Sequence, residues 1–69
     1  MEPEAIVGER VREGRRRMGL SQEAFAERLD TSHQQVGRVE RGETDLRLST
    51  LLLFAAGLET TAADLLRGV

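Results

Sequence analysis

Residues 20–42, LSQEAFAERLDTSHQQVGRVERG, decide the fold because they contain two short amphipathic segments separated by only three or four residues. The first segment begins after Ser21, whose hydroxyl can accept a hydrogen bond from an unpaired amide of a first helical turn. Phe25, Ala26 and Leu29 recur at helical spacing and form one apolar face. Asp30 is expected to end this helix, because Asp tolerates left-handed backbone geometry better than most residues. These signals predict a short helix followed by a sharp turn.

The second segment carries its own start and stop signals. Ser32 and Gln35 have the Ser-x-x-Gln spacing of a capping box, in which two orphan amides are satisfied reciprocally. Val36 and Val39 are expected to point inward, and Gly42 supplies a left-handed stop. The segment therefore predicts a helix of about ten residues. The two segments together predict a helix-turn-helix whose second helix buries one stripe and leaves one face free.

The free face of this second helix is rich in hydrogen-bonding side chains. At 100° per residue, it collects His33, Gln34, Gly37, Arg38 and Arg41, whereas Glu40 falls outside it. Arginine and glutamine can form two-point hydrogen bonds with base edges in the major groove. A face with these groups and no carboxylate indicates a helix that contacts DNA.

The chain resembles the Cro and phage-repressor family of helix-turn-helix proteins, also called the XRE family. The resemblance extends from VGERVREGRRRMGLSQ to ERGETDLRLSTLLLFAAGLETTAADLL, and its spacing is matched without a gap at Gln22, Ala26, Leu29, Ser32, Val36, Glu40 and Gly42. It implies an all-α fold, a compact five-helix bundle of the phage-repressor type with the helix-turn-helix in helices 2 and 3. It also implies one domain over residues 1–69 that acts as a sequence-specific, double-stranded DNA-binding transcriptional regulator, a dimeric repressor or controller.

The same resemblance implies roles for individual side chains. Base contacts fall to His33, Gln34 and Arg38, and backbone contacts to Gln22, Gln35, Arg41 and Arg16. Arg15 is expected to pair with Glu40 as a structural brace, with direct phosphate contact as the alternative. His33 could instead be a solvated first-turn residue, and Arg16 and Arg41 ordinary surface charges. Gly37 places no side chain in the middle of the DNA face, which either permits close approach of the helix to DNA or weakens its recognition of the base sequence.

The flanking segments predict the remaining helices. A first helix over residues 4–18 would place Val7, Val11 and Met18 inward, with Gly14 in the remaining slot. A fourth helix over residues 48–58 is expected to contribute core residues, and a fifth begins at Thr61 with Asp64 in capping-box position. The expected core residues of the fourth helix are Leu48, Leu51, Leu52, Phe54, Ala55 and Leu58.

Apolar residues near the C-terminus exceed what a small core can hold. Leu46, Leu65, Leu66 and Val69 cannot all be internal in a domain of 69 residues, so apolar surface is left over. This surplus predicts a homodimer through the region of helices 4 and 5. Such a dimer would read an inverted repeat with half-sites one helical turn apart.

Composition restricts the function further. The chain has no cysteine and one histidine, so it offers neither a disulfide framework nor a thiolate metal site, and His33 alone cannot hold a metal. No nucleophile-base pair or phosphate-binding glycine loop is present, so an enzyme is not expected and no cofactor is implied. The N-terminus MEPEAIVGER is acidic and lacks an apolar run of signal-peptide length, and no stretch approaches the roughly 20 apolar residues of a membrane span. We therefore expect a cytoplasmic protein that has no membrane partner.

Net charge is unusual for a protein that binds nucleic acid, because the chain is formally −2 at pH 7. The positive charge is local, since residues 10–18 contain five arginines and one glutamate, and every basic residue is arginine. This distribution predicts modest nonspecific affinity with steep salt dependence. The acidic ends are also compatible with the alternative function, an antitoxin-like or scaffold module whose main ligand is a protein partner.

Overall fold

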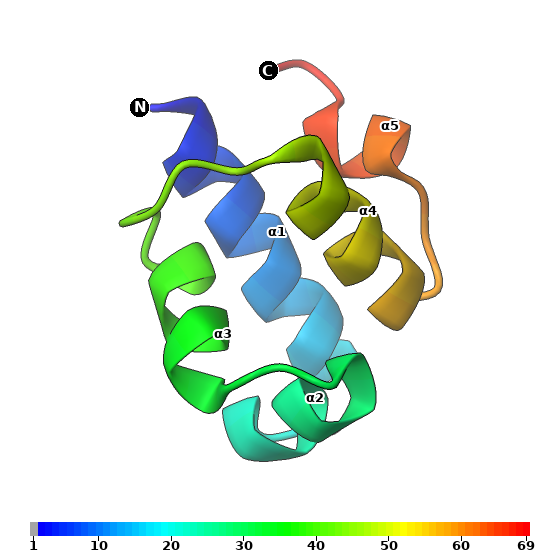
Figure 1. The fold of residues 1–69 in the computed structure, drawn as a ribbon. Coiled ribbons are helices and arrows are strands. Elements are labelled where there is room, and N and C mark those ends of the chain that lie inside the picture. The colour runs from blue at the N-terminus through cyan, green and yellow to red at the C-terminus, as the bar shows by residue number, and fades with distance from the viewer. Residues whose placement is uncertain (1) are drawn as a thin grey trace.

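The computed structural model describes residues 2–69, which form five α-helices and no strand (Figure 1). The helices are α1 (Pro3–Arg17), α2 (Gln22–Leu29), α3 (His33–Glu40), α4 (Leu48–Gly57) and α5 (Ala62–Leu66). The predicted all-α class and the order of the five helices are confirmed. Among these residues, no helix is long and apolar enough to cross a bilayer.

The first helix is the scaffold on which the others are arranged. In Figure 1, α1 runs through the middle of the molecule between α3 and α4, and α2 closes the end opposite the two chain termini. Helix α1 packs against α3 and α5, while α2 packs against α3 and α4. The α2–α3 pair is therefore held from both sides, and one face of α3 remains uncovered.

The core is built from the stripes that helical spacing predicted in the first three helices. Phe25 and Phe54 meet edge to face, with ring centroids 5.9 Å apart and an interplanar angle of 67°, a favoured aromatic geometry. The other buried apolar residues are Val7, Val11, Ala26, Leu29, Val36, Val39, Leu51, Ala55 and Leu65.

Two predictions for the fourth helix were wrong. Leu48 is 69% exposed and Leu52 is 51% exposed, although both were expected in the core. Neighbouring helices cover only one stripe of α4, and Leu51, Phe54 and Ala55 already fill that stripe. The helix is apolar on nearly every side, so periodicity could not tell which leucines face inward.

Met18 was also predicted to lie in the core, but it is only half-buried and lies outside the core cluster. It lines a surface cavity of about 420 Å³ together with Gly14 and Leu58. A Cβ at Gly14 would lie 2.9 Å from Leu58 Cδ2, so the Leu58 side chain partly fills the position that a larger residue 14 would occupy.

Candidate nucleic-acid interface

Two serines and one strained residue determine where α2 and α3 begin and turn. Ser21 Oγ accepts a hydrogen bond from the Ala24 amide at 3.0 Å, and Ser32 Oγ accepts one from the Gln35 amide at 3.2 Å. Between the helices, Asp30 adopts the predicted left-handed conformation, with φ 57° and ψ 45°. These local devices set the angle at which α3 leaves the turn.

The predicted capping boxes are only half formed. The Gln35 side chain makes no hydrogen bond back to Ser32 among the described residues, so the reciprocal arm is missing. At α5, Thr61 Oγ1 accepts from the Asp64 amide, but the Asp64 carboxylate accepts from Thr60 Oγ1 instead of the Thr61 amide. Gln35 is therefore not consumed by capping.

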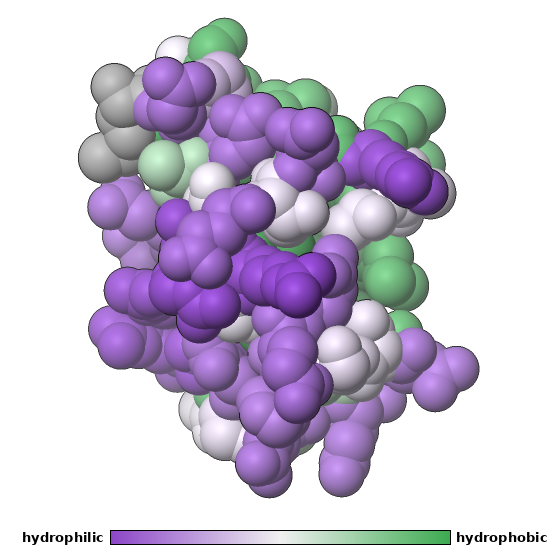
Figure 2. Space-filling model, turned by 60° about the vertical axis from the view of Figure 1, so that its left-hand side comes forward, coloured by the Kyte–Doolittle hydropathy of each residue, from purple (hydrophilic) through white to green (hydrophobic). Residues whose placement is uncertain are grey.

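The outer face of α3 carries the side chains that were predicted to read bases. His33, Gln34 and Arg38 are exposed, whereas Val36 and Val39 on the opposite side are buried. Figure 2 views the molecule with the α3 side turned forward, and hydrophilic residues dominate this view while hydrophobic ones lie mostly along the top and the right-hand side. The sequence prediction of one buried and one free face is confirmed.

Gly37 was expected on the free face, but the structure buries it. The side chain of Arg41, one turn further along α3, folds back over it, so that a Cβ at position 37 would lie 2.9 Å from Arg41 Nη1. Long helical side chains point toward the helix N-terminus, which brings residue 41 over residue 37. The gap at Gly37 is thus filled by a guanidinium group.

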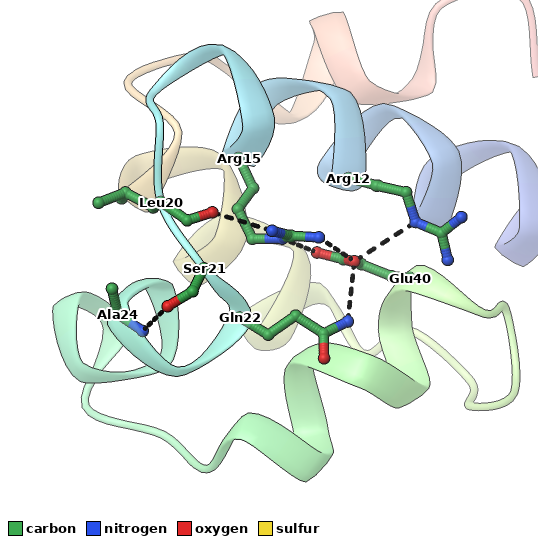
Figure 3. A network of polar contacts seen from close by, with 7 residues as sticks. All are labelled: Arg12, Arg15, Leu20, Ser21, Gln22, Ala24 and Glu40. Atoms are coloured by element: carbon green, nitrogen blue, oxygen red, sulfur yellow. Dashed lines mark hydrogen bonds and ion pairs between the residues drawn. The ribbon is translucent and has the colours of Figure 1, made fainter.

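The inner side of α3 ends in a buried carboxylate that collects donors from three helical positions (Figure 3). Arg15 binds Glu40 through two hydrogen bonds, Nε to Oε2 at 2.6 Å and Nη2 to Oε1 at 3.0 Å. Gln22 Nε2 donates to Glu40 Oε1 at 3.1 Å, and Arg12 Nε lies 3.5 Å from the same oxygen. The remaining Arg15 amino group donates to the Leu20 carbonyl at 2.9 Å. This Glu40 network links α1, the start of α2 and the end of α3.

The protonation of the Glu40 network follows from its geometry. Burial raises the pKa of Glu40, but hydrogen bonds from Arg15 and Gln22, together with the positive charges of Arg15 and Arg12, outweigh burial and hold the pKa below its usual value. The hydrogen bond to Glu40 raises the pKa of Arg15 despite burial of the guanidinium. Arg15 and Glu40 thus form a buried two-point ion pair, and removing either side chain would leave the other charge buried without its main partner.

Comparison with known proteins decides the family. A helix-turn-helix family profile matches residues 11–65. The control protein C.SmaI of Serratia marcescens is 39% identical over 66 residues, which cover 96% of this chain and 79% of that protein. The chain belongs to the helix-turn-helix family.

Solved structures of similar proteins agree with this assignment. The restriction-modification controller protein C.AhdI from Aeromonas hydrophila superposes with a TM-score of 0.83 at 35% identity, covering 90% of this chain and 94% of that one. A hypothetical transcription factor, NHTF, from Neisseria superposes with a TM-score of 0.88 at 31% identity, covering 94% and 75%. This helix-turn-helix protein is a DNA-binding transcriptional regulator and not an enzyme.

Sequence reasoning missed one residue that the helix-turn-helix protein needs for the crossing of α1 and α3. A Cβ at Gly8 would lie 2.7 Å from the Glu40 carbonyl oxygen and closer still to that of Val39. Gly8 therefore lets the two backbones approach closely, which brings the Arg15 side chain within reach of Glu40. Gly8, Arg12 and Arg15 are spaced i, i+4 and i+7, so they share one helix face, and this spacing could have revealed the contact surface.

The predicted backbone-contact residues occupy different environments in this helix-turn-helix protein. Gln22 is half-buried and already donates to Glu40, and Gln35 is half-buried on α3. Arg41 is exposed beside Glu43, with Nε 3.0 Å from Glu43 Oε1. Arg16 is exposed on α1, one turn beyond Arg12, and forms no ion pair within residues 2–69. The involvement of Gln22 and Arg12 in the Glu40 network had not been predicted.

Proposed function

We propose that this single domain, spanning residues 1–69, represses or controls transcription as a homodimer that places α3 of each subunit in successive major grooves of an inverted repeat. The observation that carries the proposal is the position of α3. The Glu40 network and Gly8 hold its inner side against α1, while its outer face presents His33, Gln34 and Arg38. A rigidly held helix with free two-point donors and acceptors is suited to direct readout.

Base discrimination falls to three side chains in this proposal. The Arg38 guanidinium would donate to O6 and N7 of guanine, Gln34 would bind adenine through its amide, and His33 would contact a base edge near the start of α3. Arg38 is expected to contribute most, because the two-point contact of arginine with guanine is the commonest specific base contact. Each two-point contact typically contributes about 1–3 kcal/mol of discrimination.

Phosphate contacts would set the register of the protein on the duplex. We assign them to Arg16, Arg41, Gln35 and Gln22, with the free amides at the N-terminus of α2 assisting Gln22. One Nε2 hydrogen of Gln22 is engaged by Glu40, which leaves its second hydrogen for a phosphate oxygen. The slope of log affinity against log salt scales with the number of phosphates that arginines neutralise, so two arginine contacts per subunit predict a moderate salt dependence.

Exposed leucines support the homodimer. The apolar surface patch consists of Leu48, Leu52, Leu53, Leu66 and Val69, all at least 41% exposed. A groove of about 320 Å³ contains Leu48 and Leu66 of this patch and is also lined by Pro3, Glu4, Val7, Leu46 and Leu51. A two-fold axis through this region would cover apolar surface on both subunits and set two α3 helices about 34 Å apart. The proposal places the dimer in the cytoplasm, with the DNA that it would bind.

One observation favours the alternative, an antitoxin-like or scaffold module with a protein partner. Four carboxylates, those of Glu2, Glu4, Glu43 and Asp45, line a cavity of about 490 Å³ beside Gly42. An acidic surface of this kind repels DNA and could bind a basic protein. It lies outside the free face of α3, so the two functions predict different sensitivities to substitution.

Selection of bound duplexes from a randomised pool tests the proposal. We expect an inverted repeat to be enriched by the wild-type protein, and Arg38→Ala to bind that repeat more weakly. Arg17→Ala is the matched control, because it removes the same charge from an 81% exposed side chain on α1. Absence of enrichment by folded wild-type protein would reject DNA reading and favour the protein-partner alternative.

A further inference from the structure

The guanidinium of Arg41 lies between two features of the chain. It occupies the space left by the missing side chain of Gly37, and it pairs with the carboxylate of Glu43. Its Nη1 lies where a side chain at position 37 would begin, 2.9 Å from the Cβ position of Gly37. Its Nε pairs with Glu43 Oε1 at 3.0 Å, and both side chains stay about half exposed, 51% for Arg41 and 56% for Glu43. Neither Nη amino group forms a hydrogen bond among residues 2–69, so two forked donors remain available.

We propose that Glu43 competes with a DNA phosphate for the Arg41 guanidinium, and that Gly37 provides the space in which the guanidinium lies against α3. This inference rests on the proposed function and deepens it. Without DNA, Glu43 neutralises Arg41. On binding, a phosphate oxygen takes the place of the carboxylate, and Glu43 returns to solvent. Glu43 therefore lowers the affinity of the protein for every duplex by the strength of one exposed ion pair per subunit.

The location of the pair explains why such competition is selective for Arg41. Gly42 is in the left-handed conformation, with φ 69°, and it reverses the chain at the end of α3. The Glu43 amide donates to the Arg38 carbonyl at 3.0 Å and the Gly42 amide to the Val39 carbonyl at 3.1 Å, which closes the helix end as a Schellman motif. Glu43 is thereby fixed beside Arg41, two residues away along the chain.

Gly37 has a second effect on Arg41. Glycine in the middle of a helix is less favourable than alanine, so Gly37→Ala would stabilise an isolated α3. The same Cβ would displace the Arg41 guanidinium from the surface of α3. Folding stability and DNA affinity should consequently change in opposite directions, which a general defect in folding cannot produce.

A double-mutant cycle of Arg41 and Glu43, measured on the inverted repeat selected by the wild-type protein, tests the competition. We expect Glu43→Gln to bind about two- to fivefold more tightly per subunit at low salt, because one exposed ion pair has about this strength. In the Arg41→Ala background, Glu43→Gln should give no more than the effect of Asp45→Asn. Asp45→Asn is the matched control, since it removes a nearby carboxylate that pairs with no arginine among the described residues. Equal gains from Glu43→Gln and Asp45→Asn, or a gain from Glu43→Gln that persists without Arg41, would overturn the proposal.

Two further measurements identify the acceptor and separate this proposal from the proposed function. If Arg41 binds phosphate, Arg41→Ala should reduce the slope of log affinity against log salt by about 2 for the dimer, one for each subunit, and leave the selected sequence unchanged. Relaxation at one base position with an unchanged slope would assign Arg41 to a base edge and reject the phosphate.

Gly37→Ala should unfold at higher temperature but bind several-fold more weakly; binding equal to wild type would count against the role of Gly37. Failure of the wild-type protein to bind any duplex would reject the proposed function itself.

Discussion

The Arg38 side chain is the most direct test of base reading at the residue scale. It is exposed and lies on the face of α3 opposite Val36 and Val39. We expect Arg38→Ala to lower specific affinity by about 1–3 kcal/mol per subunit and to relax the preference at one position in each half-site. Titration of the selected duplex and of single-base variants would measure both effects. A uniform loss across all base variants would show that Arg38 binds phosphate instead.

The two arginines that share Glu40 should differ sharply in their importance for stability. The side chain of Arg15 is 10% exposed and forms two hydrogen bonds with Glu40, whereas that of Arg12 is 40% exposed and lies 3.5 Å away. Arg15→Ala would leave a buried carboxylate without its main partner, and we expect the free energy of unfolding to fall by about 3–5 kcal/mol. Arg12→Ala should cost less than about 1 kcal/mol. Urea unfolding of both variants at pH 7 makes the comparison.

The pKa of Glu40 predicts an acid-sensitive contribution to stability. Because its pKa is lower in the folded protein than the ordinary value of 4.5, the ionised carboxylate stabilises the fold at pH above that value. The contribution is lost as pH falls from about 4.5 through the lower pKa of the folded state. We expect wild type to be more stable than Glu40→Gln at pH 7 and the difference to shrink in acid. If the difference in stability between wild type and Glu40→Gln does not change with pH, the charge of Glu40 does not contribute and the side chain acts only through packing and neutral hydrogen bonds.

At the scale of the helix, two glycines of α1 provide a matched pair. A Cβ at Gly8 would meet backbone oxygens of α3, whereas one at Gly14 would meet only the flexible Leu58 side chain. Gly8→Ala should therefore destabilise the protein by about 1–3 kcal/mol or more, despite the better helix propensity of alanine. Gly14→Ala should be neutral or stabilising by up to about 1 kcal/mol. Thermal unfolding of the two variants tests the pair, and equal effects would contradict the close crossing of α1 and α3.

Much of the element-scale structure could be predicted because its signals are local. Ser21 and Ser32 cap their helices, and Asp30 and Gly42 end them in left-handed conformations. Each of these devices involves residues only a few positions apart, so it can be recognised in the chain alone. The leucines of α4 could not be sorted in this way, because their burial depends on which neighbouring helix covers them.

At the scale of the whole molecule, the apolar surface patch predicts how the subunits associate. Leu52 is half exposed on α4 within this patch. We expect Leu52→Glu to abolish dimerisation, because a carboxylate would have to be desolvated at the interface. The monomer should keep its helical content and its weak affinity for a single half-site, but lose the tighter binding to the inverted repeat.

Sedimentation equilibrium and half-site titrations of Leu52→Glu supply the measurement. Retention of the dimer would move the interface away from α4. Loss of half-site binding as well would show that the substitution disturbs α3, so the comparison separates association from DNA contact.

The sequence by itself determined the helix ends, the helix-turn-helix and the free face of α3, because caps, left-handed stops and apolar periodicity act over a single turn or two. Tertiary structure alone decided the rest. It added Arg12 and Gln22 to the Arg15–Glu40 pair expected from the sequence, required glycine at position 8, laid Arg41 over Gly37 and left Leu48 and Leu52 exposed. Three of these features depend on how helices cross and cover one another, and the fourth on the path of a long side chain. Neither is encoded in the spacing of any single segment.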